Sequence, residues 1–179
     1  MKEYKYKKMN EMLQILEELQ MPSKLKNTRT ILTLLSVAKM KEKSKWSHVE
    51  EVYSRTHDMI LFMNENYPNK GGTDEKRGGY SENSRETIRD DTVAPLCNII
   101  VLEHNGAKSQ SEKSGYRLTK EFATLLRTYG TESWKEELDF YLTTHQTYEE
   151  KYSQIRQIDK GMSVVYNGEE FHLKRSAHN

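Results

Sequence analysis

The fold of this chain is decided by the stretch Tyr80–Leu118, YSENSRETIRDDTVAPLCNIIVLEHNGAKSQSEKSGYRL. In its first half, apolar residues recur at helical spacing over residues 83–97. Asn83 and Ser84 are both residue types that cap the N-terminus of a helix. Pro95 lacks a backbone N–H group and is expected to kink this helix or shorten its last turn. The first half of the stretch therefore predicts a helix.

The second half predicts two short strands joined by a loop. Ile99–Leu102 is a β-branched apolar run, and Tyr116–Leu118 follows after a polar segment. Asn105-Gly106 is the strongest short hairpin signal, although the second strand is delayed beyond it. The intervening GAKSQSEKSG is polar, rich in glycine and serine, and carries two lysines. Two strands with such a loop, directly after a helix, form the pattern of a wing.

Helices are expected on both sides of this stretch. Residues 53–67 and 119–129 have helical periodicity, and Gly130 ends the second of these helices. The order helix, helix, strand, loop, strand, helix across 53–129 is that of a winged helix-turn-helix. In that motif the second helix enters the major groove of DNA.

The whole chain is expected to be mainly α, a winged helix-turn-helix with extra flanking helices and a small C-terminal β-hairpin. We divide it into N-terminal helices packed on the core (1–52), the winged helix-turn-helix region (53–130), a long helix or helical extension (131–160) and a terminal hairpin (161–179).

Local signals place several element ends. Pro22 should end the first helix, and Ser23 or Asn27 should cap the second. Ser47 with Glu50 matches a capping box. The segment 68–80 holds four glycines and a proline, which predicts a loop that is functional or a hinge. Trp46 and Trp134 are expected as core anchors rather than as platforms on which bases stack.

Composition narrows the class of protein. The 179 residues suit one domain or two small ones, and 35% of them are hydrophobic, enough for a small core. The single cysteine, Cys97, excludes an internal disulfide, indicates a reducing compartment and is expected in the core. No apolar run approaches the roughly 20 residues that span a bilayer. These features predict a cytoplasmic protein with no membrane partner.

Charge is distributed unevenly. Residues 1–45 hold eleven Lys and Arg against five Asp and Glu, a balance of +6, whereas residues 121–160 hold five against eight, a balance of −3. A basic front and an acidic back would orient the molecule toward a polyanion such as DNA. The alternative is that the lysine-rich surface only keeps the protein soluble.

The expected recognition helix carries side chains that suit DNA. Arginine donates twice to guanine, asparagine pairs with adenine, and glutamate accepts from the cytosine amino group. The candidate base-reading residues are Asn83, Ser84, Arg85, Glu86 and Arg89. However, residues 82–91 have a net charge of −2, so Arg85 and Arg89 could instead pair with Glu86, Asp90 or Asp91 on a solvated helix face.

An acidic recognition helix requires phosphate contacts from elsewhere. The candidate phosphate-binding residues are Lys24, Lys26, Arg29, Thr87, Lys108, Lys113 and Arg117.

Catalysis by the chain itself is not expected. A metal-dependent phosphodiesterase needs carboxylates that converge on an ion, but neighbours such as Glu169 and Glu170 in a strand point to opposite faces. The six histidines are scattered without zinc-site spacing, and the glycines of GGTDEKRGG lack the lysine-serine context of a phosphate-binding loop. No catalytic residue, metal ligand or cofactor is therefore predicted here.

Three segments resemble the N-terminal helix-turn-helix region of the BsuBI/PstI family of type II restriction endonucleases. They are MNEMLQILEEL, GGYSENSRETIRDDTV and GYRLTKEFATLLRTYGTESW, within residues 9–158. The resemblance implies reading of a short palindromic DNA site and, in the parent enzyme, cleavage with magnesium by a following PD-(D/E)XK domain. Asp90 and Asp91 depart from the more basic family pattern. The tail MSVVYNGEEFHLKRSAHN looks like the opening hairpin of the nuclease domain, so the chain is expected to bind DNA without cutting it.

Two other classes remain open. A stand-alone winged-helix transcription regulator would also bind DNA but should dimerise by itself, and the 131–158 helix is a candidate interface. A helical protein-interaction domain would bind no DNA and would be indifferent to Arg85→Ala. A palindromic site would favour the endonuclease and would require two copies, so a homodimer is an expectation of that reading.

Overall fold

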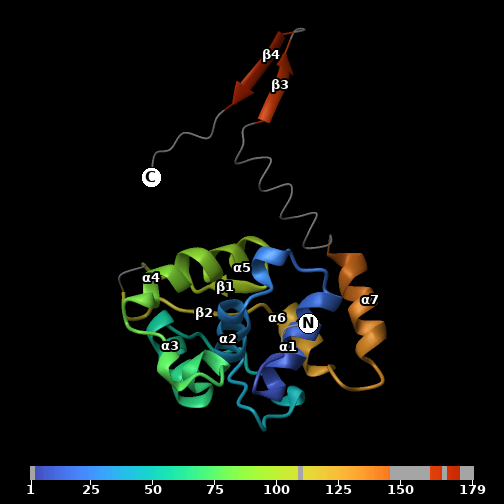
Figure 1. The fold of residues 1–179 in the computed structure, drawn as a ribbon. Helices are drawn as coiled ribbons and strands as arrows, with labels where there is room; N and C mark the ends of the chain where they lie inside the picture. The colour runs from blue at the N-terminus through green and yellow to red at the C-terminus, as the bar shows by residue number, and fades with distance from the viewer. Residues whose placement is uncertain (1–2, 109–110, 146–161, 167–168, 174–179) are drawn as a thin grey trace.

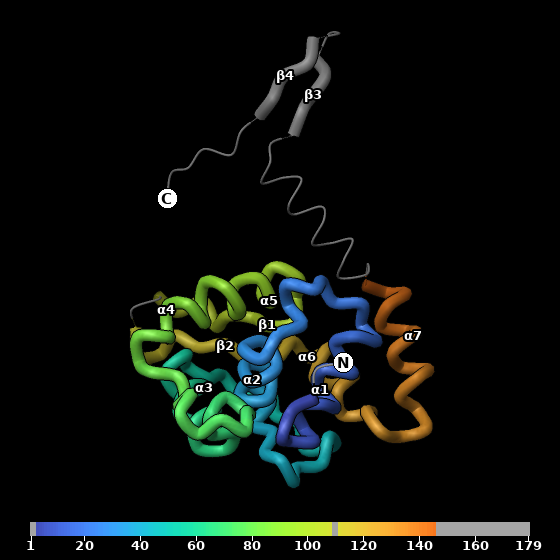
Figure 2. Tube along the Cα trace, viewed as in Figure 1, coloured from blue at the N-terminus to red at the C-terminus, as the bar shows by residue number. Residues whose placement is uncertain are grey.

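A computed structural model describes residues 3–108, 111–145, 162–166 and 169–173 of the chain. Within these residues the molecule is mainly helical, and the strands form two small antiparallel sheets. Helix α2 (Thr28–Val37) passes through the middle of the helical body in Figures 1 and 2, with α1 (Lys7–Glu18) packed against it. The expectation of a mainly α protein is confirmed.

Helix α2 is central because its residues can be buried on every side. All residues from Thr30 to Val37 are buried. The hydroxyls of Thr33 and Ser36 donate to carbonyl oxygens of the preceding turn, as Ser36 does to Thr33, whereas Thr30 Oγ1 is buried without a hydrogen-bond partner among the described residues. Asn27 caps the helix: its side-chain oxygen accepts from the Thr30 N–H at 2.9 Å. The predicted cap at Asn27 is therefore confirmed, and it fixes where the chain turns into the core.

The segment between α2 and the next helix differs from the expectation. Instead of a capping box at Ser47 and Glu50, the chain makes a short 3₁₀ turn, η2 (Trp46–His48), without a side-chain cap. Here tertiary contacts override the local signal, because Trp46 is nearly buried and its indole N–H donates to Glu11 on α1 at 2.9 Å. The expected role of Trp46 as a core anchor is confirmed.

Helix α3 (Thr56–Asn66) begins three residues later than the sequence pattern predicts. The delay has a hydrogen-bonding cause, because Ser54 pairs antiparallel with Tyr116 through N–H to carbonyl bonds of 2.8 and 2.9 Å. After α3 the glycine-rich segment contains two 3₁₀ turns, η3 (Pro68–Gly71) and η4 (Glu75–Arg77).

The expected helix over residues 83–97 is observed as α4 (Ser84–Ile88), a π-helical turn η5 (Arg89–Val93) and α5 (Ala94–Asn98) in one continuous run. The π turn precedes Pro95, whose ring and missing N–H disturb the regular ladder, and the wider turn accommodates that disturbance. The expected side-chain cap at Asn83 or Ser84 is wrong, because backbone turns from Ser81 and Glu82 begin the helix instead.

The first strand is displaced from its expected position. β1 is Leu102–His104 rather than 99–102, and it pairs antiparallel with β2 (Tyr116–Leu118), Leu102 opposite Leu118. The Ile99 N–H instead donates to the Pro95 carbonyl oxygen, and Ile100 has a φ of +62°. The apolar run thus completes the preceding helix before the strand starts.

Two further helices follow strand β2. Helix α6 (Lys120–Arg127) is followed by α7 (Trp134–Thr144), and the Trp134 indole N–H donates to Glu18 of α1 at 2.7 Å. Gly130, in the turn between them, has a φ of +77°, which glycine adopts without strain. The expected helix to about residue 158 is wrong in its described part, because α7 ends at Thr144 and His145 is extended. The rest of that expectation lies outside the described residues.

The expected C-terminal hairpin is confirmed. β3 (Met162–Tyr166) pairs antiparallel with β4 (Glu169–Leu173), and Tyr166 lies opposite Glu169.

Candidate nucleic-acid interface

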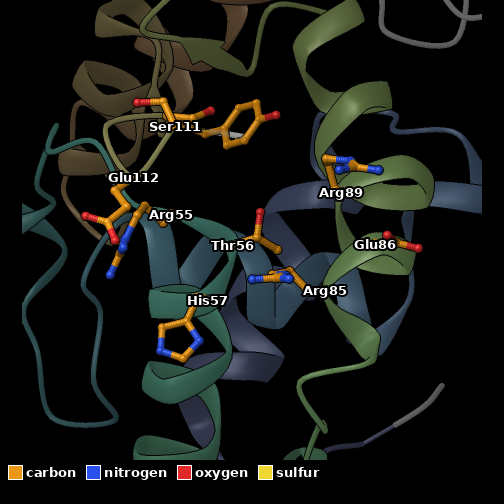
Figure 3. A pocket seen from close by; sticks show the side chains of 10 residues that line it. Arg55, Thr56, His57, Arg85, Glu86, Arg89, Ser111 and Glu112 are labelled. Atoms are coloured by element: carbon orange, nitrogen blue, oxygen red, sulfur yellow. The ribbon is translucent and has the colours of Figure 1, made fainter. Parts of the chain in front are cut away.

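A cleft of about 540 Å³ opens where three elements meet: the start of α3, the outer face of α4 and the loop that joins β1 to β2 (Figure 3). It is lined by Arg55, Thr56, His57, Arg85, Glu86, Arg89, Ser111, Glu112, Ser114 and Tyr116. Three of the lining residues are arginines, which can donate hydrogen bonds to anions, and two are glutamates, which can accept hydrogen bonds.

Helix α4 presents its share of the wall because of its amphipathic sequence. Ile88 is fully buried and anchors the inner face. Arg85 and Arg89 are four residues apart and lie on the same outer face, next to Glu86. The structure therefore brings together three of the five predicted base-reading residues, Arg85, Glu86 and Arg89. Asn83 is exposed and Ser84 half-buried, and neither lines the cleft.

The second wall is the N-terminus of α3. Arg55 is its N-cap residue, and the Arg55 side chain does not cap the helix. Arg55 and His57 line the cleft beside Thr56, which is nearly buried. These residues are not candidates from sequence alone. The signal that could have found Arg55 is a basic residue in the first turn of the helix expected over residues 53–67.

The third wall is the loop after β1, which Asn105 organises. The Asn105 side-chain amide donates to the Lys113 carbonyl oxygen, and its oxygen accepts from the Ala107 N–H at 3.1 Å. A bond of 2.8 Å between His104 Nε2 and Ser114 Oγ ties the two sides of the loop together. The Asn105-Gly106 signal thus marks the turn that shapes this loop.

Each cleft arginine is paired with a carboxylate. Arg55 Nε lies 3.0 Å from Asp58, Arg85 Nη1 lies 3.3 Å from Glu82, and Arg89 Nε lies 2.8 Å from Asp90. The hydrogen bond from Arg89 holds the pKa of the Asp90 carboxyl below its usual value, and the same bond raises the pKa of Arg89. The expected pairing on the helix surface is therefore observed, but Arg85 pairs with Glu82 and not with Glu86.

The predicted phosphate-binding residues lie at several places. Lys108 and Lys113 are exposed in the β1–β2 loop, and Thr87 is exposed on α4. Lys24 belongs to the 3₁₀ turn η1 (Ser23–Leu25), and Lys26 follows it. None of these residues lines the cleft.

Two predicted phosphate contacts have structural partners. Arg29 donates to Thr92 Oγ1 at 3.0 Å and approaches Asp91 at 3.7 Å, which ties α2 to the π turn. Arg117 pairs with Glu103 and stacks over the Tyr53 ring at 4.5 Å. Sequence could not reveal these partners, because Arg29 and Thr92 are far apart in the chain.

In the part of the chain that the structure describes, no group of three or more His, Cys, Asp or Glu side chains is placed to hold a metal ion. Burial, and secondarily the charge of Glu103, raises the pKa of the half-buried Cys97 thiol to about 11, which makes it a poor nucleophile near neutral pH. Among the same residues, every helix is too short or too polar to cross a bilayer.

Residues 6–150 match the family model described as "BsuBI/PstI restriction endonuclease HTH domain". The chain is 30% identical over 182 residues to type II restriction enzyme BsuBI of Bacillus subtilis, covering 99% of this chain and 55% of that protein. It is 27% identical over 166 residues to type II restriction enzyme AplI of Arthrospira platensis, covering 89% of this chain and 48% of that protein. The chain thus spans about half the length of these relatives.

A solved structure, that of SdaI restriction endonuclease, superposes with a TM-score of 0.66 at 19% identity, over 94% of this chain and 51% of that one. At this identity the likeness concerns the fold. The sequence match extends over most of the helical body and includes every element that lines the cleft. The chain belongs to the family of BsuBI/PstI restriction endonuclease HTH domains.

Proposed function

We propose that this chain recognises a short double-stranded DNA sequence as the helix-turn-helix domain of a type II restriction enzyme. The observation that carries the proposal is the cleft between the α4–η5 run and the β1–β2 loop, which Arg85 and Arg89 line. Membership of the restriction endonuclease HTH family supports it.

The order of elements supports a winged helix-turn-helix. In this assignment α3 is the first helix of the motif, α4 to α5 is the recognition helix and the β1–β2 loop is the wing. The Ser54–Tyr116 bridge adds a third, very short strand beside the hairpin. A recognition helix placed in a major groove would bring the wing and the start of α3 toward the adjacent phosphates.

The cleft side chains suit direct reading of bases. Arg85 and Arg89 can each donate twice to a guanine edge, and Glu86 can accept from the cytosine amino group. Asn83 and Ser84, at the start of the same helix, are proposed to extend this contact. The proposed phosphate contacts include Lys108 and Lys113 on the wing, Thr87, Lys24 and Lys26. Arg29 and Arg117 would first have to leave Asp91 and Glu103.

Cleavage is proposed for the whole enzyme rather than for these residues. Magnesium chemistry needs convergent carboxylates, and the described residues offer no such group. The donor set therefore does not fit a catalytic metal, and we derive no cleavage step from it. We place the metal-binding residues in the half of the relatives that this chain does not match. A palindromic target would also imply two copies of the domain.

The first experiment is selection of bound duplexes from a random DNA pool by the purified chain at near-physiological salt. Enrichment of a motif of about 5–8 base pairs is expected, and a palindrome would favour the endonuclease over a regulator. Weak, salt-sensitive binding without enrichment would mean that the remaining half of the enzyme is needed for reading. Absence of any binding would contradict the proposal and leave a protein-interaction domain.

A further inference from the structure

The carboxylate of Glu82 joins two walls of the cleft without lining it. One oxygen lies 2.9 Å from Nδ1 of His57 on α3, and the other lies 3.3 Å from Nη1 of Arg85 on α4. Both partners line the cleft, whereas Glu82 stands just before α4. It therefore engages Arg85 before any DNA arrives.

The other two carboxylates act more locally. Asp58 pairs with Arg55 within the first turn of α3, and Asp90 pairs with Arg89, its neighbour in sequence. Only Glu82, among these three, connects different elements. Its position between α3 and α4 lets one carboxylate act on a side chain of each of these two walls.

We propose that Glu82 is a specificity-determining residue, because it competes with DNA phosphates for Arg85 and so weakens binding to unrelated sequences. This inference rests on the proposed DNA-reading function. The pair is exposed, since 56% of the Arg85 side chain and 51% of the Glu82 side chain are accessible, so the arginine can leave it at modest cost. Glu82 thus restrains Arg85 without preventing its exchange.

The competition acts differently on the two kinds of complex. In an unrelated complex Arg85 gains only a phosphate contact, and the carboxylate left behind repels that phosphate. In the correct complex the arginine moves to a base edge, where two directed hydrogen bonds compensate for the lost partner. A carboxylate at this position therefore penalises the wrong sequence more than the right one, which is a way to gain discrimination by weakening competitors.

The test compares wild type with Glu82→Gln on two duplexes of equal length, one carrying the selected motif and one with the motif scrambled. Glu17→Gln is the matched control, since Glu17 is exposed on α1 and the substitution removes the same charge away from the cleft. Binding is measured over a salt series, and thermal unfolding of all three proteins is recorded.

We expect Glu82→Gln to strengthen binding to the scrambled duplex about three- to tenfold at low salt and to change binding to the selected duplex less. The slope of log affinity against log salt on the scrambled duplex should steepen by about one. The control should resemble wild type on both duplexes.

Equal strengthening on both duplexes, or a result like that of Glu17→Gln, would overturn the inference. So would weaker binding to both together with a lower melting temperature, because Glu82 would then only hold α3 to α4. Failure of the wild type to bind any duplex is a different result, and it would refute the proposed function itself.

Discussion

Two groups of charged side chains in this molecule have similar chemistry and different surroundings. On α1, Lys8 lies 2.9 Å from Glu11, which also accepts from the Trp46 indole at 2.9 Å, and only 7% of the Lys8 side chain is exposed. In the cleft, Arg85 pairs with Glu82 but is 56% exposed.

This difference in burial shows which ion pair stabilises the fold. The Lys8 ammonium lies over the Trp46 ring at 4.7 Å, so the first pair is packed against the core and breaking it leaves buried polar groups without partners. The cleft pairs face solvent, and an exposed pair contributes little to stability. The first group is thus fixed, whereas the second is free to exchange its partner for a ligand.

The largest effect should come from removing the aromatic ring beneath the α1 pair. Trp46→Ala should lower the free energy of unfolding by about 3–5 kcal/mol, because it opens a cavity and removes the indole donor to Glu11. The measurement is the midpoint of urea unfolding. Phe140→Ala on α7, where the ring is 66% exposed, is the matched control and should change stability by less than about 0.5 kcal/mol. Equal effects would mean that Trp46 is not a core anchor.

The cleft should respond in the opposite way. Arg85→Ala should weaken binding to the selected duplex by about 1–3 kcal/mol through loss of a bidentate base contact, and leave the unfolding midpoint unchanged. Lys26→Ala is the comparison, because a phosphate contact should affect all sequences alike and reduce the salt slope. If Arg85→Ala lowered specific and non-specific binding equally, the assignment of α4 as recognition helix would be incorrect.

A smaller effect concerns pH. Burial alone would raise the pKa of Glu11, but hydrogen bonds from Lys8 and Trp46 and the charge of Lys8 outweigh it, so the pKa in the folded protein is lowered from 4.5. A carboxyl with a depressed folded pKa stabilises the protein above its unfolded pKa, and this contribution is lost as the pH falls through the folded value. Urea midpoints should therefore fall more between pH 5 and pH 3 for wild type than for Glu11→Gln. If the urea midpoints of the two proteins changed equally with pH, the Lys8–Glu11 pair would not stabilise the fold.

The smallest effect is on the reactivity of Cys97. Because burial raises its thiol pKa to about 11, alkylation by iodoacetamide should be slow at pH 8 in the folded protein and accelerate as the pH approaches that value. The sequence contains one cysteine, so incorporation measured by mass reports this site alone. Protein unfolded in urea is the control and should react faster at pH 8. Equal rates would show that the thiol is accessible and that α5 opens readily.

Much of the architecture follows from the sequence alone, because its signals are local. Helical periodicity predicts α1, α2 and α3, the side chain of Asn27 caps α2, and Tyr116–Leu118 forms β2 as expected. Arg85 and Arg89 share one face simply because they are four residues apart on a helix. The resemblance to restriction endonucleases likewise resides in contiguous segments, and the family match confirms it.

Only the tertiary structure decides what distant residues do to one another. The 3₁₀ turn at Trp46 replaces a capping box because Glu11 offers its indole a partner, and α3 starts late because Ser54 pairs with Tyr116. Arg29 contacts Thr92 rather than remaining free for a phosphate. Packing between elements also brings Arg55 and His57 into the cleft. It likewise allows Glu82 to bridge α3 and α4. No local pattern of residues encodes such contacts.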